Sequence, residues 1–111
     1  MIIRVRTVLA ANGTASILSG SLFEFVDSPS IVEIGVSADA PGVLVGINSG
    51  PDTLLEADSP VVLKAINVTP VYPDDFVSDE ALPGDRLSVK VRDTSGAQRI
   101  VMTELRISPL G

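Results

Sequence analysis

The stretch "DRLSVKVRD", residues 85–93, decides the fold class of this chain. Leu87, Val89 and Val91 alternate with polar and basic residues, which is the two-residue period of a half-buried β-strand. The turn sequence TSGA follows, and QRIVMTELRIS, residues 98–108, repeats the alternation. Two such runs joined by a short turn that contains glycine predict a β-hairpin.

Further short alternating runs separated by turn residues fill most of the remaining sequence. They are IIRVRTVL (2–9), LFEFV (22–26), IVEIGVS (31–37), VLVGIN (43–48), TLLEA (53–57) and PVVLKAINV (60–68). The last run is apolar on both faces, which predicts a strand covered on both sides. The sequence therefore predicts an all-β fold: a single β-sandwich over residues 1–111, jelly-roll-like or immunoglobulin-like. We expect seven to nine short, mostly antiparallel strands, and at most one helical turn near residues 77–82, capped by Ser78.

The composition excludes several kinds of chemistry. The 111 residues include no His and no Cys, so imidazole bases, thiolate nucleophiles and the usual zinc sites are absent. The chain also lacks Trp, and aromatic residues make up only 4% of it, which disfavours sugar-stacking sites. We expect no catalytic residue, no metal ligand set and no cofactor, and hence a protein that is not an enzyme.

The first residues and the hydropathy bear on localisation. Arg4 and Arg6 lie inside the first apolar run, whereas a signal peptide has its basic residues before an uninterrupted apolar segment. No run of about 18 apolar residues occurs, so no membrane span is expected. The expectation is a soluble protein that is not exported by this route, without a signal peptide and with no membrane partner.

The net charge of −6 is distributed unevenly along the chain. Residues 7–81 carry eleven acids and one basic residue, Lys64, whereas both ends are basic. The overall acidity argues against specific nucleic-acid binding. The basic side chains of the terminal strands form a positive patch if those strands are neighbours, and otherwise are solvated. They are Arg4, Arg6, Arg86, Lys90, Arg92, Arg99 and Arg106.

The acidic segment VYPDDFVSDEALPGDR, residues 71–86, has several interpretations. Its carboxylates suit a calcium site, with Asp79 and Asp85 the best pair, or a carboxylate pair for hydrolysis. However, the EF-hand spacing is absent, so a solvated connection is the favoured interpretation and calcium is the less favoured alternative. If the segment has a function, we expect Asp74, Asp75 and Asp79 to contact the basic strand face of a neighbouring subunit.

Tyr72 lies in a segment that Pro70 and Pro73 stiffen. Such a preorganised tyrosine suits a binding anchor. The favoured interpretation is that the segment caps the open end of the sandwich, with Phe76 in the core.

Three segments follow one another along the chain: GVLVGINSGPDTLLEADSPV, PVYPDDF and PGDRLSVKVRDTSGA. This order of strand-like runs and turns resembles that of small β-sandwich virion proteins of tailed bacteriophages, the capsid cement or decoration proteins. This resemblance implies a non-enzymatic structural subunit that is made in the cytoplasm of the host cell and located in the virion. Its partners would be other copies of itself and a major capsid or other virion protein. The alternative function is a ligand-binding sandwich for glycans or calcium-dependent adhesion. The expected partner contacts are Arg4, Arg6, Arg86, Lys90, Arg92, Tyr72, Asp74, Asp75 and Asp79.

Overall fold

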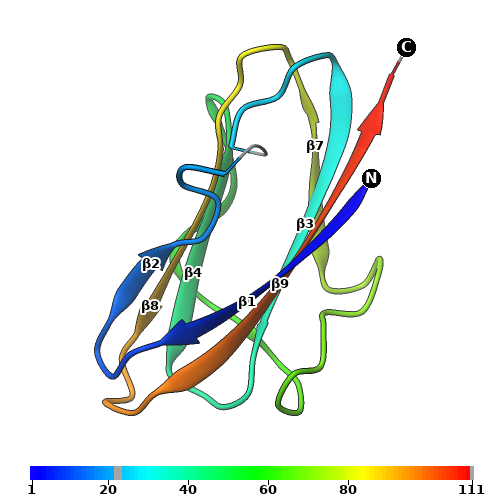
Figure 1. Ribbon diagram of the computed structural model, residues 1–111. Coiled ribbons are helices and arrows are strands. Elements are labelled where there is room, and N and C mark those ends of the chain that lie inside the picture. The colour runs from blue at the N-terminus through cyan, green and yellow to red at the C-terminus, as the bar shows by residue number, and fades with distance from the viewer. Residues whose placement is uncertain (22–23, 111) are drawn as a thin grey trace.

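A computed structural model describes residues 1–21 and 24–110 of the chain, and its regular structure consists of β-strands (Figure 1). The strands are β1 (Ile2–Leu9), β2 (Thr14–Ser16), β3 (Ser30–Ala38), β4 (Val43–Ser49), β5 (Asp52–Pro60), β6 (Val62–Leu63), β7 (Phe76–Ala81), β8 (Leu87–Asp93) and β9 (Arg99–Pro109). This confirms the predicted all-β fold.

The strands form two packed sheets, which Figure 1 shows as separate layers. Sheet A has the order β1-β9-β3, and β7 and β6 share the other edge of β3. Sheet B has the order β2-β8-β4-β5. The antiparallel pairs β1·β9, β2·β8, β3·β7 and β4·β5 fold the chain like one long hairpin wrapped into a sandwich. This strand order is that of a jelly roll, one of the two predicted sandwich types.

The core lies between the sheets and is built from the apolar face of each strand. In β3, the buried residues Val32, Ile34 and Val36 alternate with residues of the outer face, as the sequence pattern predicts. The same alternation holds in β4, β8 and the first strand, β1. The buried apolar side chains are almost all aliphatic, so close packing of Val, Ile and Leu excludes water from the interior.

The predicted hairpin of residues 85–108 is wrong, although both of its strands exist. β8 belongs to sheet B and β9 to sheet A, so the chain crosses from one sheet to the other between them. Asp93 organises this crossing, because its carboxylate accepts hydrogen bonds from the backbone N–H groups of Asn12, Ser95 and Gly96. These bonds, with the Ser95 hydroxyl as the largest contribution, lower the pKa of Asp93 to about 2.

The helical turn predicted near residues 77–82 is also wrong, because this segment is the strand β7. It pairs with β3 from Ser30↔Ala81 to Gly35↔Phe76, and Val77 and Ala81 face the interior. Pairing with β3 supplies the backbone hydrogen bonds that a capped helical turn would otherwise make locally.

Two other predicted strands differ from the structure. Residues 60–68 do not form a covered central strand: β6 is two residues long, and a loop follows it. In the predicted strand 22–26, residues 22 and 23 lie outside the described part of the chain, so the alternation of this run stays a prediction. Phe25 is exposed and forms an isolated β-bridge with Arg86.

Candidate interaction surfaces

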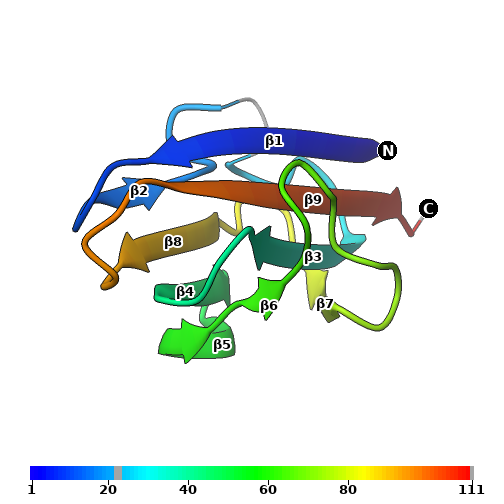
Figure 2. The ribbon, with the colours of Figure 1, turned by 90° about the horizontal axis from the view of Figure 1, so that it is seen from below.

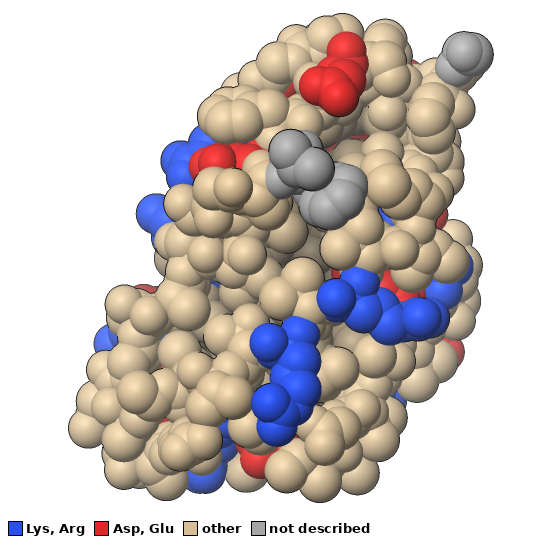
Figure 3. All heavy atoms as spheres, in the orientation of Figure 1, with Lys and Arg blue, Asp and Glu red and all other residues tan. Residues whose placement is uncertain are grey.

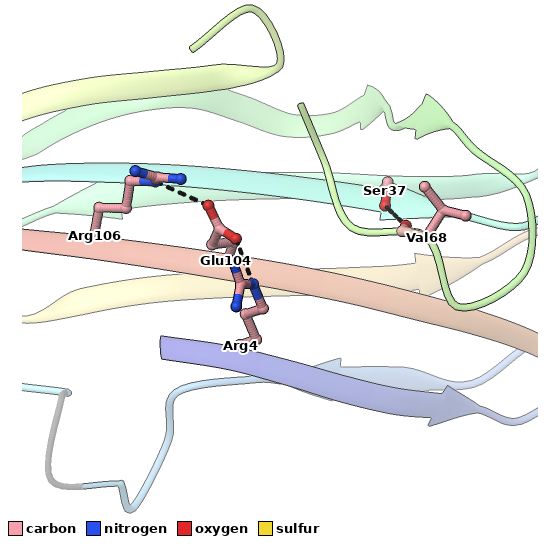
Figure 4. A network of polar contacts seen from close by, with 5 residues as sticks. All are labelled: Arg4, Ser37, Val68, Glu104 and Arg106. Atoms are coloured by element: carbon pink, nitrogen blue, oxygen red, sulfur yellow. Dashed lines mark hydrogen bonds and ion pairs between the residues drawn. The ribbon is translucent and has the colours of Figure 1, made fainter. Parts of the chain in front are cut away.

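A buried carboxylate lies at the centre of the outer face of sheet A. Glu104 is only 2% exposed, and its two oxygens accept hydrogen bonds from Arg4 Nε at 2.7 Å and Arg106 Nε at 2.9 Å (Figure 4). The β1·β9 register places Arg4 directly opposite Glu104, and Arg106 follows two residues later on the same face. A carboxylate removed from water needs such charged donors, and here it has two.

The loop of residues 64–75, named here the covering loop, crosses this face between β6 and β7 (Figure 2). Arg6 Nε donates a hydrogen bond to Asn67 Oδ1 at 2.8 Å, and Ser37 Oγ donates one to the Val68 carbonyl at 3.2 Å. Figure 4 shows the second contact beside the Glu104 cluster. Contacts from β1 and β3 therefore hold the loop against sheet A.

Asp75, one of the predicted partner contacts, joins the two ends of the covering loop through its carboxylate. Asp75 accepts a hydrogen bond from the Val71 N–H at 2.7 Å and pairs with Lys64 at 3.2 Å. The Val71 hydrogen bond, more than the Lys64 interaction, lowers the pKa of Asp75. Its neighbour Asp74 is exposed. Asp75 thus has a structural role in the loop, whereas Asp74 stays accessible.

Tyr72 lies on sheet A, which corrects the expected cap at the end of the sandwich. The Arg106 guanidinium lies 3.8 Å from the centre of the Tyr72 ring, within cation–π range. The Phe76 ring meets Tyr72 edge-on at 5.2 Å and is not in the core, because it lies on the outer face against Gly35. A hydrogen bond to Glu33 raises the pKa of Tyr72 above its ordinary value.

The covering loop and the end of β6 present several large apolar side chains to solvent. We name this set the apolar loop surface; it consists of Leu63, Ile66, Val68, Val71 and Tyr72, which are between 42% and 59% exposed. Loops on protein surfaces are usually polar. The polar contacts of this loop point toward the sheet, and its apolar side chains remain outside.

The outer face of sheet B is organised differently and contains a groove with a volume of about 520 Å³. β8 contributes Lys90 and Arg92 to it, and Asp58 from the edge strand β5 pairs with Arg92 at 2.9 Å. The remaining polar lining consists of Thr14, Ser16 and Asn48. The β4·β5 pairing is irregular beside the groove, and the missing side chain of Gly46 lets the Ala57 backbone of β5 lie against it.

The basic residues of the terminal strands do not form one patch. Arg4, Arg6 and Arg106 belong to sheet A, whereas Lys90 and Arg92 belong to sheet B. The view in Figure 3 shows the basic side chains in several separate groups. The expected patch required β1, β8 and β9 to be neighbours, and the crossing after β8 places β8 in the opposite layer.

Arg86 and an acidic cluster lie at one end of the sandwich. Arg86 pairs with Glu24 at 2.6 Å. The negative charge of Asp79 is the main cause that raises the pKa of Asp52, and Asp85 adds to it. Asp79 shares the inward-facing parity of Val77 and Ala81 in β7 and lies opposite the buried Val32, so it does not reach the outer face of sheet A. In residues 1–21 and 24–110, no group of three or more acidic side chains is arranged to hold a metal ion.

Comparison with known proteins gives no family. No protein-family model and no curated protein sequence matches this chain. In the part of the chain that the structure describes, no helix is long and apolar enough to cross a membrane. The functional argument therefore depends on the two outer faces.

Sequence reasoning missed Glu104 and the groove. A signal for Glu104 was present, because it is an acid on the outer parity of its strand, two residues before Arg106. Its burial depends on the β1·β9 register and on the covering loop, which the alternation does not reveal. The groove depends on Gly46 and on the irregular pairing of β5, and neither has a distinct sequence pattern.

Proposed function

We propose that this protein is a non-enzymatic structural subunit of a viral particle, a capsid cement or decoration type of protein. It acts by associating with further copies of itself and with a major structural protein of the particle. The observation that carries the proposal is the apolar loop surface, where five large apolar side chains are exposed on one short segment.

Burial of these side chains in an interface supplies the driving force for association. Contiguous exposed apolar area is typical of protein interaction sites, and each Å² that a partner covers contributes about 25 cal/mol. Tyr72 adds an aromatic anchor of the kind enriched in interfaces. Its ring is already fixed by Arg106 and Phe76, so less conformational entropy is lost on binding.

The fold is compatible with this function but does not single it out. Eight-stranded jelly rolls occur in viral capsid proteins, and also in lectins and cupins. The fixed loop on sheet A and the absence of His and Cys favour the structural role among these.

Light scattering after size-exclusion chromatography, over a range of concentrations, tests the self-association. We expect an oligomer for the natural chain and a monomer for Ile66→Asp and Val71→Asp. Leu82→Asp is the matched control, because Leu82 is 60% exposed but lies outside the covering loop. A natural chain that is monomeric at the highest concentration, or a control that dissociates equally, contradicts the proposal.

The viral part of the proposal needs a separate measurement. Purified particles from an infected culture of the source should contain this chain at a fixed ratio to the major structural protein, measured by quantitative mass spectrometry. The Ile66→Asp variant should be depleted from the particles, and the Leu82→Asp variant should be retained. Particles that lack the natural chain would exclude a virion protein.

A further inference from the structure

Lys90 lies in the groove of sheet B without a protein partner. The chain has eight basic side chains, and the other seven make an ion pair or a side-chain hydrogen bond. Lys90 makes neither with any residue that the structure describes. A free ammonium group can donate three hydrogen bonds, so the groove contains unused donors.

Polar groups without side-chain hydrogen bonds in the described structure line the same groove as Lys90. The strand register places Ser16 beside Lys90 on one side and Gly46 on the other, and all three residues line the groove. Thr14 and Asn48 contribute a hydroxyl and an amide to the same lining. Hydroxyl and amide groups both donate and accept hydrogen bonds, which suits a ligand rich in hydroxyl groups.

The charges of the groove limit the ligand to a single negative charge. Arg92 is paired with Asp58, so Lys90 supplies the one uncompensated positive charge. The whole chain has a net charge of −6, which disfavours polyanions. A monoanion that also carries hydroxyl groups matches both the charge and the polar lining.

We propose that this groove binds an acidic sugar of the hexuronate class. The sugar carboxylate accepts hydrogen bonds from Lys90, and its hydroxyls exchange hydrogen bonds with Thr14, Ser16 and Asn48. The volume of about 520 Å³ is within the range of about 300–1,000 Å³ found for small-molecule sites. This binding activity goes beyond the assembly role, since it uses the opposite face of the sandwich.

Titration of the isotope-labelled full chain with sodium glucuronate, followed by the NMR shifts of backbone amides, tests the proposal. Glucose, inorganic phosphate and sodium chloride at matched ionic strength are the comparison probes. We expect saturable shifts confined to residues 14–16, 44–48, 57–58 and 88–92 with glucuronate. Replacing the charged donor in Lys90→Gln should weaken binding about tenfold or more, because the sugar carboxylate loses its hydrogen bond from a charged group.

Two further variants separate the site from the net charge. Lys90→Arg keeps the positive charge and should retain most of the affinity. Arg6→Ala removes the same charge from sheet A and should leave the affinity unchanged. Equal shifts with glucose, binding of phosphate without glucuronate, or an unchanged affinity in Lys90→Gln would each overturn the proposal.

The monomeric variant Ile66→Asp distinguishes this inference from the proposed function, because it should still bind glucuronate. Groove shifts that depend on protein concentration in the absence of sugar would indicate that carboxylates of a second copy occupy the site. That outcome would also overturn the assignment to an acidic sugar.

Discussion

The two outer faces of the sandwich differ in how their charged groups are paired. On sheet A, Glu104 is buried between two arginines, and the covering loop lies across the strands. On sheet B, the Arg92–Asp58 pair is solvent-exposed, and Lys90 has no partner in the described residues. The covering loop thus lies over the outer face of sheet A, whereas the groove on sheet B can be reached by a solute.

This difference follows from the length of the connections on each face. The segment between β6 and β7 is long enough to lie across sheet A, and its polar groups bond to the strands beneath. The β4·β5 connection on sheet B is a tight turn, and the outer faces of β4 and β8 line a groove instead. A covered face can present the apolar side chains of its loop, whereas an uncovered one presents the alternating polar residues of its strands.

The largest expected difference between the faces is the loss of stability when a carboxylate on each face is replaced by its amide. Glu104→Gln should destabilise the protein by about 2–3 kcal/mol, because two arginines lose the charged acceptor of a buried site. The value is below that of a fully buried pair, since Arg4 is 58% and Arg106 25% exposed. Urea denaturation monitored by circular dichroism measures the free energy of unfolding.

Asp58→Asn is the matched control on sheet B. It removes the charge from an exposed ion pair and should cost only about 0–1 kcal/mol. Asparagine also tolerates the positive φ of 66° at this position, so no backbone strain is added. Equal effects of the two substitutions would show that the Glu104 cluster contributes no more than a surface pair, and the comparison between the faces would fail.

The sequence predicted the faces of the strands but not their partners. The burial of Val32, Ile34 and Val36 follows from alternation, because one face of each strand must be apolar. Alternation is the same in a hairpin and in a crossing between sheets, so the pairing of β8 with β9 was predicted wrongly. Local turns follow more directly from the residues, because Asn12 and Gly13 both tolerate positive φ, and Asn12 has φ 56°.

The candidate sites depend on contacts between distant segments, which a single sequence does not specify. Residues 77–82 carry a capping serine and acids in the order of a helix start, yet pairing with β3 determines their conformation. Tyr72 was expected at the end of the sandwich, and its position over Arg106 depends on the path of the covering loop. Partner contacts at Arg4, Arg86 and Asp74 stay predictions.

A smaller difference in stability is expected between alanine substitutions at Gly35 on sheet A and Gly46 on sheet B. A Cβ at Gly35 would lie 2.8 Å from the Phe76 ring and 3.0 Å from Pro70, in a place that the covering loop fills. We expect Gly35→Ala to destabilise the protein by about 1–2 kcal/mol, because neither neighbour can move without loosening the loop.

Gly46→Ala is the corresponding change on sheet B. Its Cβ would lie 3.0 Å from the Ala57 Cα, which belongs to the irregular stretch of the edge strand β5 and can shift outward. Alanine also restricts the unfolded chain more than glycine does, which stabilises the folded state by about 0.4–1 kcal/mol. This gain offsets the cost of the close contact, so the net change in the free energy of unfolding should be small. Urea denaturation of both variants gives the comparison, and a larger loss for Gly46→Ala would contradict a closed sheet A.

The smallest expected effect is a shift in the pKa of Tyr72, the only tyrosine of the chain. The hydrogen bond to Glu33 is the main cause that raises this pKa above 10.0, and burial adds to it. The pKa is higher in the folded than in the unfolded state. The contribution of Tyr72 to stability is therefore complete below pH 10 and is lost as the pH rises through the folded pKa.

Absorbance at the phenolate band against pH reports only on sheet A, because sheet B carries no tyrosine. The midpoint should lie above 10.0 in the natural chain and fall in Glu33→Ala, where Arg106 then favours the phenolate. Glu56→Ala removes the same charge from sheet B and should leave the midpoint unchanged. An ordinary midpoint in the natural chain would mean that the Tyr72 ring moves freely in solution, and the covering loop would then not hold this side chain against the sheet.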